Sequence, residues 1–202
     1  LGVLDAQCWA RDPDDKGKSE RRKETPIEDK ESMKWLRSFR KVAAVQKLCS
    51  DTKLVSIGDR EADIYELFLE AVKDPHGPKL LVRSAKSRQR KVDQEHLWSF
   101  MSNLKIAGSV KVQIPGNKEY KAREAILDIR FSGVVLTPPN DTDYLSIKVW
   151  AVYALESEPM DGQPQIEWML LTTEAVNNLD DAKQRIEWYS GRWGIEVYHR
   201  TL

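Results

Sequence analysis

The stretch TKLVSIGDREADIYELFLEAV, residues 52–72, decides the fold class of this chain. Its first seven residues form a short, nearly continuous apolar run, which is typical of a strand buried on both faces. In the residues that follow, apolar side chains recur at the spacing of a helix, at Ile64, Leu67, Phe68 and Ala71. A second apolar run, KLLVR at 79–83, comes after a turn. Strand, helix and strand in this order predict parallel neighbours in an α/β sheet.

The chain on either side of this unit follows two different patterns. Upstream we expect a strand at 2–10, a charge-dense loop at 11–31 and a helix within 31–49. Downstream of residue 85, apolar residues alternate at period two in four runs, which are 108–114, 125–131, 134–137 and 145–155. This alternation predicts antiparallel β structure inserted into the α/β core.

The closing segment returns to the pattern of the core. We expect a strand at 167–173 and a last helix from about Leu179. The predicted organisation is therefore a first part of the core at 1–85, a β-rich insertion at 86–165, and a final core segment at 166–202.

Composition restricts the class of protein. The chain has 202 residues, of which 41% are hydrophobic and 32% charged, which indicates a folded, water-soluble protein. No apolar run approaches the roughly 18 residues of a membrane span, so no membrane partner is expected. Cys8 and Cys49 are too few for a disulfide framework, which favours a reducing, cytoplasmic location. Because the chain begins at Leu1 and not at Met, we expect a fragment of a longer protein.

Charge is balanced overall but not locally. The chain contains 32 basic and 32 acidic residues, so the average field does not favour nucleic acid. Residues 79–91, however, contain six basic side chains and no acid. Such a stripe is compatible with phosphate contact, and a solvated loop is the alternative interpretation.

Two carboxylates lie where chemistry is expected. Asp59 ends a predicted strand and precedes a helix, although an Asp at this position is also an ordinary helix cap. Glu61 and Asp63 follow in the first helical turn, where the helix dipole explains them. Glu196 lies on the last helix, and a wheel places it at the rim of the apolar stripe. A strand-end and a helix-rim carboxylate are suited to Mg²⁺ and phosphoryl chemistry.

Tyr189, Arg192 and Glu196 follow one another at spacings of three and four in this helix. Arg192 and Tyr189 precede the acid by one or two turns and are placed to hold a phosphate backbone. A surface ion pair between Arg192 and Glu196 is the alternative, worth only a few tenths of a kcal/mol in this orientation.

These residues resemble a known family. Tyr189, Arg192 and Glu196 reproduce the Y-x2-R-x3-E part of the Y-x2-R-x3-E-x6-K signature of bacterial cut-and-paste insertion-sequence transposases of the DDE class. The similarity extends, in family order, to ESMKWL (31–36), IGDREADIY (57–65), LVRS (81–84) and WMLLT (168–172). It covers nearly the whole chain, and DREADI together with the spaced Tyr-Arg-Glu is its most specific part.

The resemblance implies a fold and a reaction. It implies an RNase H-like, retroviral integrase-like core, with the β-rich insertion between the second and third catalytic acids. Asp59 matches the second acid and Glu196 the third. Two ions of Mg²⁺, or of Mn²⁺, held by such acids would activate water to cut DNA at the transposon end. The freed 3′ hydroxyl would then attack the opposite strand and later the target DNA.

The resemblance also implies DNA contacts. Tyr189 and Arg192 match residues that grip phosphates near a base turned out of the stack, and Trp168 matches an aromatic that stacks on such a base. A buried core tryptophan is the alternative for Trp168. Arg83 matches a DNA-contacting arginine, and Lys86 and Arg88 extend this group. The implied partners are double-stranded DNA and a second copy of the chain on paired ends, at the bacterial nucleoid.

Two features depart from the family pattern. The first catalytic Asp is expected before Leu1, and the signature lysine falls past Leu202, so the fragment alone is expected to be inactive. A non-catalytic DNA-binding remnant or regulator is therefore the main alternative. A stand-alone metal nuclease that cuts without joining ends is another.

Overall fold

The computed structural model describes residues 31–93, 95–116, 119–140 and 142–195. The strand expected at 2–10 and Glu196 lie outside the described residues. The helices and strands are α1 (Met33–Gln46), β1 (Val55–Gly58), α2 (Tyr65–Lys73), β2 (Lys79–Arg83), β3 (Lys91–Val92), β4 (Glu95–His96), α3 (Leu97–Asn103), β5 (Gly108–Ile114), β6 (Arg123–Leu136), β7 (Ile147–Glu156), β8 (Glu167–Thr172) and α4 (Leu179–Gly191). Two short 3-10 turns, η3 (Arg60–Ala62) and η4 (Lys86–Arg88), follow β1 and β2.

The predicted strand–helix–strand unit is present. β1 and β2 pair in parallel, with Val55 opposite Lys79 and Gly58 opposite Val82. This pairing confirms the prediction of parallel neighbours, and α2 forms the connection between the two strands. β1 is less buried than its apolar run suggests, since Ser56 and Ile57 are only half-buried. The reason is that β1 lies at the edge of the sheet and, among the described strands, pairs only with β2.

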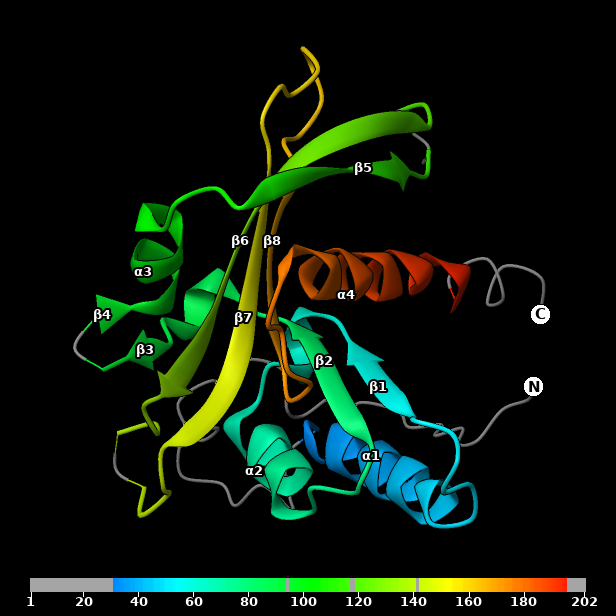
Figure 1. The fold of residues 1–202 in the computed structure, drawn as a ribbon, viewed down its shortest axis with the longest axis vertical. Helices are drawn as coiled ribbons and strands as arrows, with labels where there is room; N and C mark the ends of the chain where they lie inside the picture. The colour runs from blue at the N-terminus through cyan, green and yellow to red at the C-terminus, as the bar shows by residue number, and fades with distance from the viewer. Residues whose placement is uncertain (1–30, 94, 117–118, 141, 196–202) are drawn as a thin grey trace, which may run out of the picture.

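The remaining strands extend the same sheet in antiparallel fashion. The sheet has eight strands in the order β1-β2-β8-β7-β6-β3-β4, with β5 also paired to β6 (Figure 1). β8 is antiparallel to both of its neighbours, β2 and β7. The runs expected at 125–131 and 134–137 form the single strand β6, which pairs with β7 through Ser132 and Gly133 without a break. The protein is therefore a mixed α/β fold with a mostly antiparallel sheet, and the strands of 86–165 continue the sheet of the core.

Helices cover both faces of the sheet. One hydrophobic cluster, here called the three-helix face, joins α1, α2 and α3 to the strands through residues such as Phe39, Phe68 and Met101. The other cluster, the α4 face, joins α4 to the strands through Ala182 and Ile186. Successive residues of β8 alternate between the two clusters, as the period of two in a strand requires.

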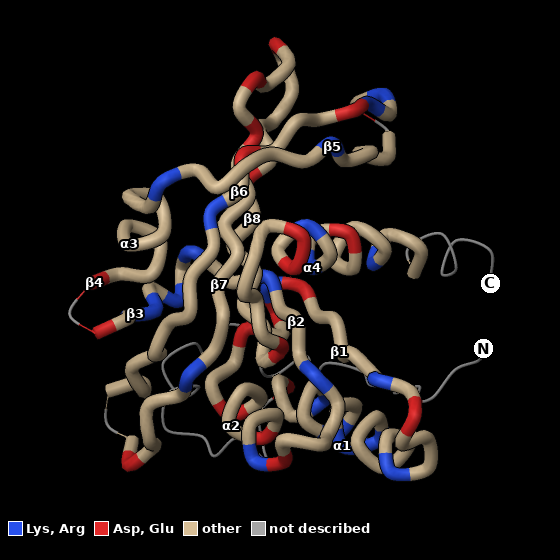
Figure 2. Tube along the Cα trace, viewed as in Figure 1, with Lys and Arg blue, Asp and Glu red and all other residues tan. Residues whose placement is uncertain are grey.

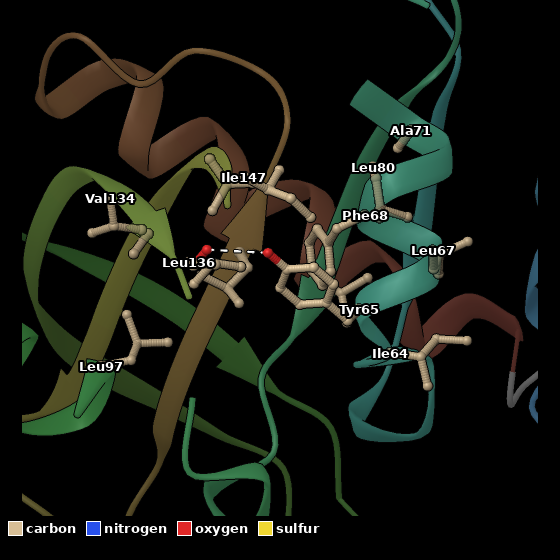
Figure 3. Packing of buried hydrophobic residues seen from close by; sticks show 14 of the residues in the cluster. Ile64, Tyr65, Leu67, Phe68, Ala71, Leu80, Leu97, Val134, Leu136 and Ile147 are labelled. Atoms are coloured by element: carbon tan, nitrogen blue, oxygen red, sulfur yellow. Dashed lines mark hydrogen bonds between the residues drawn. The ribbon is translucent and has the colours of Figure 1, made fainter. Parts of the chain in front are cut away.

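Tyr65 links α2 to the strands on the three-helix face through a buried hydrogen bond. It is 2% exposed, and its hydroxyl shares its single proton between the carbonyl oxygens of Leu136 at 3.1 Å and Leu145 at 2.9 Å. Figure 3 shows the ring of Tyr65 lying between α2 and the strand that carries Leu136. Burial raises the pKa of the Tyr65 phenol, so it remains a donor. These bonds connect the strand–helix–strand unit to a strand far along the chain.

The helix expected directly after Asp59 is interrupted. Residues 60–62 form η3, and α2 begins only at Tyr65. Asp63 has a ψ of 68°, which is not helical. The side chain of Asp63 pairs with Arg90 and is fully buried. The break in the helix therefore directs Asp63 into the core, whereas an uninterrupted helix was expected to leave it in the first turn.

Gly58 is a position where the packing requires glycine. A Cβ on Gly58 would overlap the Cβ of Ala62, which cannot move without shifting η3. We predict that Gly58→Ala lowers the free energy of unfolding by about 1–3 kcal/mol in urea denaturation. Gly133→Ala is the control, because its Cβ would meet its nearest neighbour, Trp150 Nε1, at an ordinary 3.7 Å. Equal effects of the two substitutions would contradict this packing.

A buried ion pair makes stability depend on pH. Glu156, 1% exposed, accepts from Arg123 Nη2 at 3.0 Å and from the Ile166 amide at 2.9 Å. The bond from Arg123 holds the pKa of Glu156 below its ordinary value of 4.5, against the opposing effect of burial. A carboxyl whose pKa is lower in the folded state contributes stability above its unfolded pKa and loses it as the pH falls.

We therefore expect the free energy of unfolding to decline as the pH falls below about 4.5, with Glu156 contributing to the slope. Glu156→Gln should flatten this part of the profile and, by leaving Arg123 buried without its acid, cost about 3–5 kcal/mol at neutral pH. Glu124→Gln, on the neighbouring strand β6 and in an exposed pair with Lys111, is the control and should leave the profile unchanged. An unaltered acid slope in Glu156→Gln would refute the assignment.

Candidate functional site

A pocket of about 390 Å³ opens where the two parallel strands end. It is lined by Arg60, Glu61, Ala85, Ser87 and Arg88. The first two belong to η3, directly after β1, and the others to the turn around η4, directly after β2. The carboxyl ends of parallel strands are where α/β sheets form binding sites, because the loops that follow neighbouring strands meet there.

Asp59 lies at the entrance to η3. Its Oδ1 accepts from the Glu61 amide at 2.9 Å, so the capping interpretation is correct. This bond occupies one of the two carboxylate oxygens, and capping is therefore compatible with binding a cation. Val55 and Ile57 pack on the α4 face, and Asp59 continues their alternation. The side chain is half-buried.

The basic residues from the end of β2 onward divide into two groups. Arg83 donates from Nη2 to the carbonyl oxygen of Glu167 at 3.1 Å. Lys86 Nζ lies 3.7 Å from Glu167 Oε2 and 5.0 Å from the centroid of the Trp98 ring. Arg88 is exposed and lines the pocket. Figure 2 shows Lys and Arg positions along the chain between β2 and β3. Arg83 and Lys86 thus contact Glu167 at the start of β8, whereas Arg88 lines the pocket.

Trp168 and Tyr189 lie in the core of the α4 face. Each is 3% exposed, and their rings meet edge to face with centroids 5.2 Å apart. Trp193 adds a second edge-to-face contact to Trp168 at 5.7 Å. This geometry supports the core interpretation of Trp168, because a stacked base would have to displace Tyr189 or Trp193. The Arg192 guanidinium lies 5.7 Å from the centroid of the Tyr189 ring.

The end of α4 and the residues of β1 that lead to Asp59 share one face of the sheet. Asn178 caps α4 by accepting from the Asp181 amide at 2.9 Å, and the helix runs to Gly191. Trp193 and Ile57 both pack against the α4-face cluster. Glu196 follows three residues after Trp193, outside the described residues, so its distance from Asp59 stays a prediction.

The metal prediction also remains open. Among residues 31–195, apart from the few positions not described, no three His, Cys, Asp or Glu side chains converge as a metal site. Asp59 provides one carboxylate of the kind that Mg²⁺ prefers, and the other predicted ligand in this chain, Glu196, lies outside the described residues. The donor set of the described residues is thus chemically suitable but partial.

Three residues of the site were not predicted. Arg60 lines the pocket beside Asp59. Asp63, assigned above to the helix dipole, is instead fully buried and paired with Arg90 at 2.6 Å. The dipole explanation is wrong, because the helix does not begin until Tyr65. The run of five basic residues after Val82 could have suggested a buried acidic partner for one of them.

Comparison with known protein families gives no match to any family model. Among the described residues, no helix has both the length and the apolar character needed to cross a bilayer.

The position of Trp168 can be tested by truncation. We predict that Trp168→Ala lowers the free energy of unfolding by about 3–5 kcal/mol, since it removes a buried aromatic that contacts Tyr189 and Trp193. Denaturation followed by circular dichroism measures this change. Trp98→Ala is the control on the other face, where the ring is only half-buried and should cost less. Full stability with weakened DNA binding would instead favour base stacking.

Proposed function

We propose that this chain belongs to the catalytic domain of a DDE-class DNA transposase with an RNase H-like core. The observation that carries the proposal is the pocket itself. Its lining includes the exposed cations Arg60 and Arg88 on two adjoining turns, and the strand-end carboxylate Asp59 directly precedes Arg60 at the start of η3. Phosphodiester chemistry requires a carboxylate for a divalent ion beside cations that hold the phosphate backbone. The family resemblance of the surrounding motifs supports the same conclusion.

Each side chain then has a role. Asp59 and Glu196 hold Mg²⁺ or Mn²⁺, two ions in the complete site. When bound, these ions would activate water or a 3′ hydroxyl and stabilise the charge that develops on the phosphate. Arg88 and Arg60 contact the backbone near the cut. Arg83 and Lys86 extend the DNA surface toward β8, where Glu167 orients both.

The aromatic residues of α4 have a supporting role. Tyr189 is buried and its ring lies under the guanidinium of Arg192. This contact supports a role for Tyr189 in holding Arg192, and we assign the phosphate contact to Arg192. Double-stranded DNA at transposon ends and target is the substrate, a homodimer on paired ends is the working form, and the bacterial cytoplasm is the location.

The proposal predicts a metal-dependent DNA cleavage activity that is lost when either proposed metal-binding carboxylate is replaced. In a protein that carries the natural sequence on both sides of this chain, Asp59→Asn and Glu196→Gln should each reduce Mg²⁺-dependent cleavage of transposon-end DNA by at least about 100-fold. The measurement is product formation on a labelled duplex, followed by strand transfer into a plasmid. Glu124→Gln is the control, since Glu124 pairs with Lys111 at 2.9 Å, has an exposed side chain and does not line the pocket.

Each outcome separates the candidate functions. Unchanged cleavage in Asp59→Asn would remove the catalytic assignment. Cleavage without strand transfer would favour a metal nuclease. DNA binding without cleavage by the wild-type protein would favour a non-catalytic remnant or regulator.

A further inference from the structure

The segment after β2 is fixed at both ends by one buried carboxylate. Asp63 Oδ2 accepts from the Ser84 hydroxyl at 3.0 Å and from the Ala85 amide at 2.8 Å. Its Oδ1 accepts from Arg90 Nε at 2.6 Å. Arg90 Nη2 also donates to the backbone oxygen of Asp63 at 3.0 Å. Asp63 is 0% exposed, so these bonds replace all of its contact with water.

The residues between these two anchors form the wall of the pocket. Ser87 and Arg88 lie in η4 and are exposed, and both line the pocket. The turn closes at Gln89, whose φ of 47° lies in the left-handed region that residues other than glycine seldom adopt. Such a conformation persists when its surroundings hold it in place. The anchors on either side of η4 provide this restraint.

Arg90 is itself held rigidly. Its guanidinium lies 5.7 Å from the ring centroids of both Tyr65 and Phe68 on α2. Arg90 therefore contributes to the core and not to the exposed basic surface. Of the basic residues in 79–91, it is the one that folding removes from solvent to neutralise Asp63.

We propose that Asp63 is a positioning residue that presets the η4 turn for contact with a DNA backbone phosphate. It acts through Arg88 and does not touch the substrate. Asp63 also lies one residue after η3, so it fixes the turn that follows Asp59 relative to the turn that carries Arg88. The inference rests on the proposed function, since it names a residue that prepares the same pocket for its phosphate.

Whether Asp63→Asn weakens or tightens DNA binding distinguishes a positioning role of Asp63 from a simple effect of its charge. Asp63→Asn removes a negative charge, and electrostatics alone would make binding of DNA tighter. Loss of positioning should instead weaken binding roughly tenfold and reduce the slope of log K against log salt by about one phosphate contact, as Arg88→Ala does. The double variant Asp63→Asn/Arg88→Ala should show little further loss, because both changes remove one contact.

The experiment measures binding of a labelled DNA duplex to the 202-residue chain by fluorescence anisotropy from low to moderate salt. Hydrogen exchange at the Ala85 amide, measured without DNA, reports the anchor directly and should accelerate at least about tenfold in Asp63→Asn. Glu156→Gln is the matched control, because it also leaves an arginine of a buried pair without its acid but lies outside the pocket. It should lower the melting temperature while leaving the salt slope unchanged.

The outcomes separate the inference from the proposed function. If Arg88→Ala reduces the slope and Asp63→Asn does not, positioning is refuted and DNA binding stands. If the wild-type chain binds no duplex, both fail together. Should Asp63→Asn not fold, Ser84→Ala removes one anchor while keeping the ion pair, and it should weaken binding in the same direction. Unchanged binding and exchange in Ser84→Ala would then overturn the inference.

Discussion

The carboxylate of Asp63 is the interaction on which the candidate site depends. A buried charge is tolerated only when it is paired and its lone pairs are satisfied, and Asp63 meets this condition with Ser84, Ala85 and Arg90. The donors all come from the segment after β2, whereas Asp63 itself follows β1. Burial of one acid thus joins the ends of two parallel strands. The pocket lies between these joined turns.

The two faces of the sheet hold different parts of the candidate site in place. The three-helix face holds the pocket turns, because Arg90 packs on Tyr65 and Phe68 and Tyr65 reaches across to Leu136. The α4 face sets the direction of the last helix through the contacts of Trp168 with Tyr189 and Trp193. The proposed metal site belongs with the α4 face, since Asp59 continues the alternation of Val55 and Ile57 and Glu196 follows α4 in the sequence.

The antiparallel strands also contribute to the site. β8 lies between β2 and β7, so the strands of 86–165 reach the pocket region through it. Glu167 at the start of β8 contacts both Arg83 and Lys86 and accepts from the Tyr153 hydroxyl of β7 at 2.8 Å. The basic surface is therefore oriented by a strand that is remote in sequence.

The sequence alone determined the local elements and one topological feature. The apolar runs and helical spacing of 52–83 predicted β1, α2 and the parallel pairing of β1 with β2, because these depend on neighbouring residues and a short connection. Period two predicted antiparallel strands in 108–155. The break before Tyr65 was missed, since the contacts that bend the chain there come from Ser84, Ala85 and Arg90, some twenty residues away.

Only the tertiary structure decided which charged and aromatic residues face inward. Asp59, Glu61 and Asp63 look alike in sequence, yet Asp59 caps a turn, Glu61 is exposed, and Asp63 is buried. Likewise Arg88 and Arg90 are two residues apart in one basic stripe, but one lines the pocket and the other pairs with Asp63. The physical reason is that burial of a charge depends on a partner brought near by folding, which local pattern does not encode.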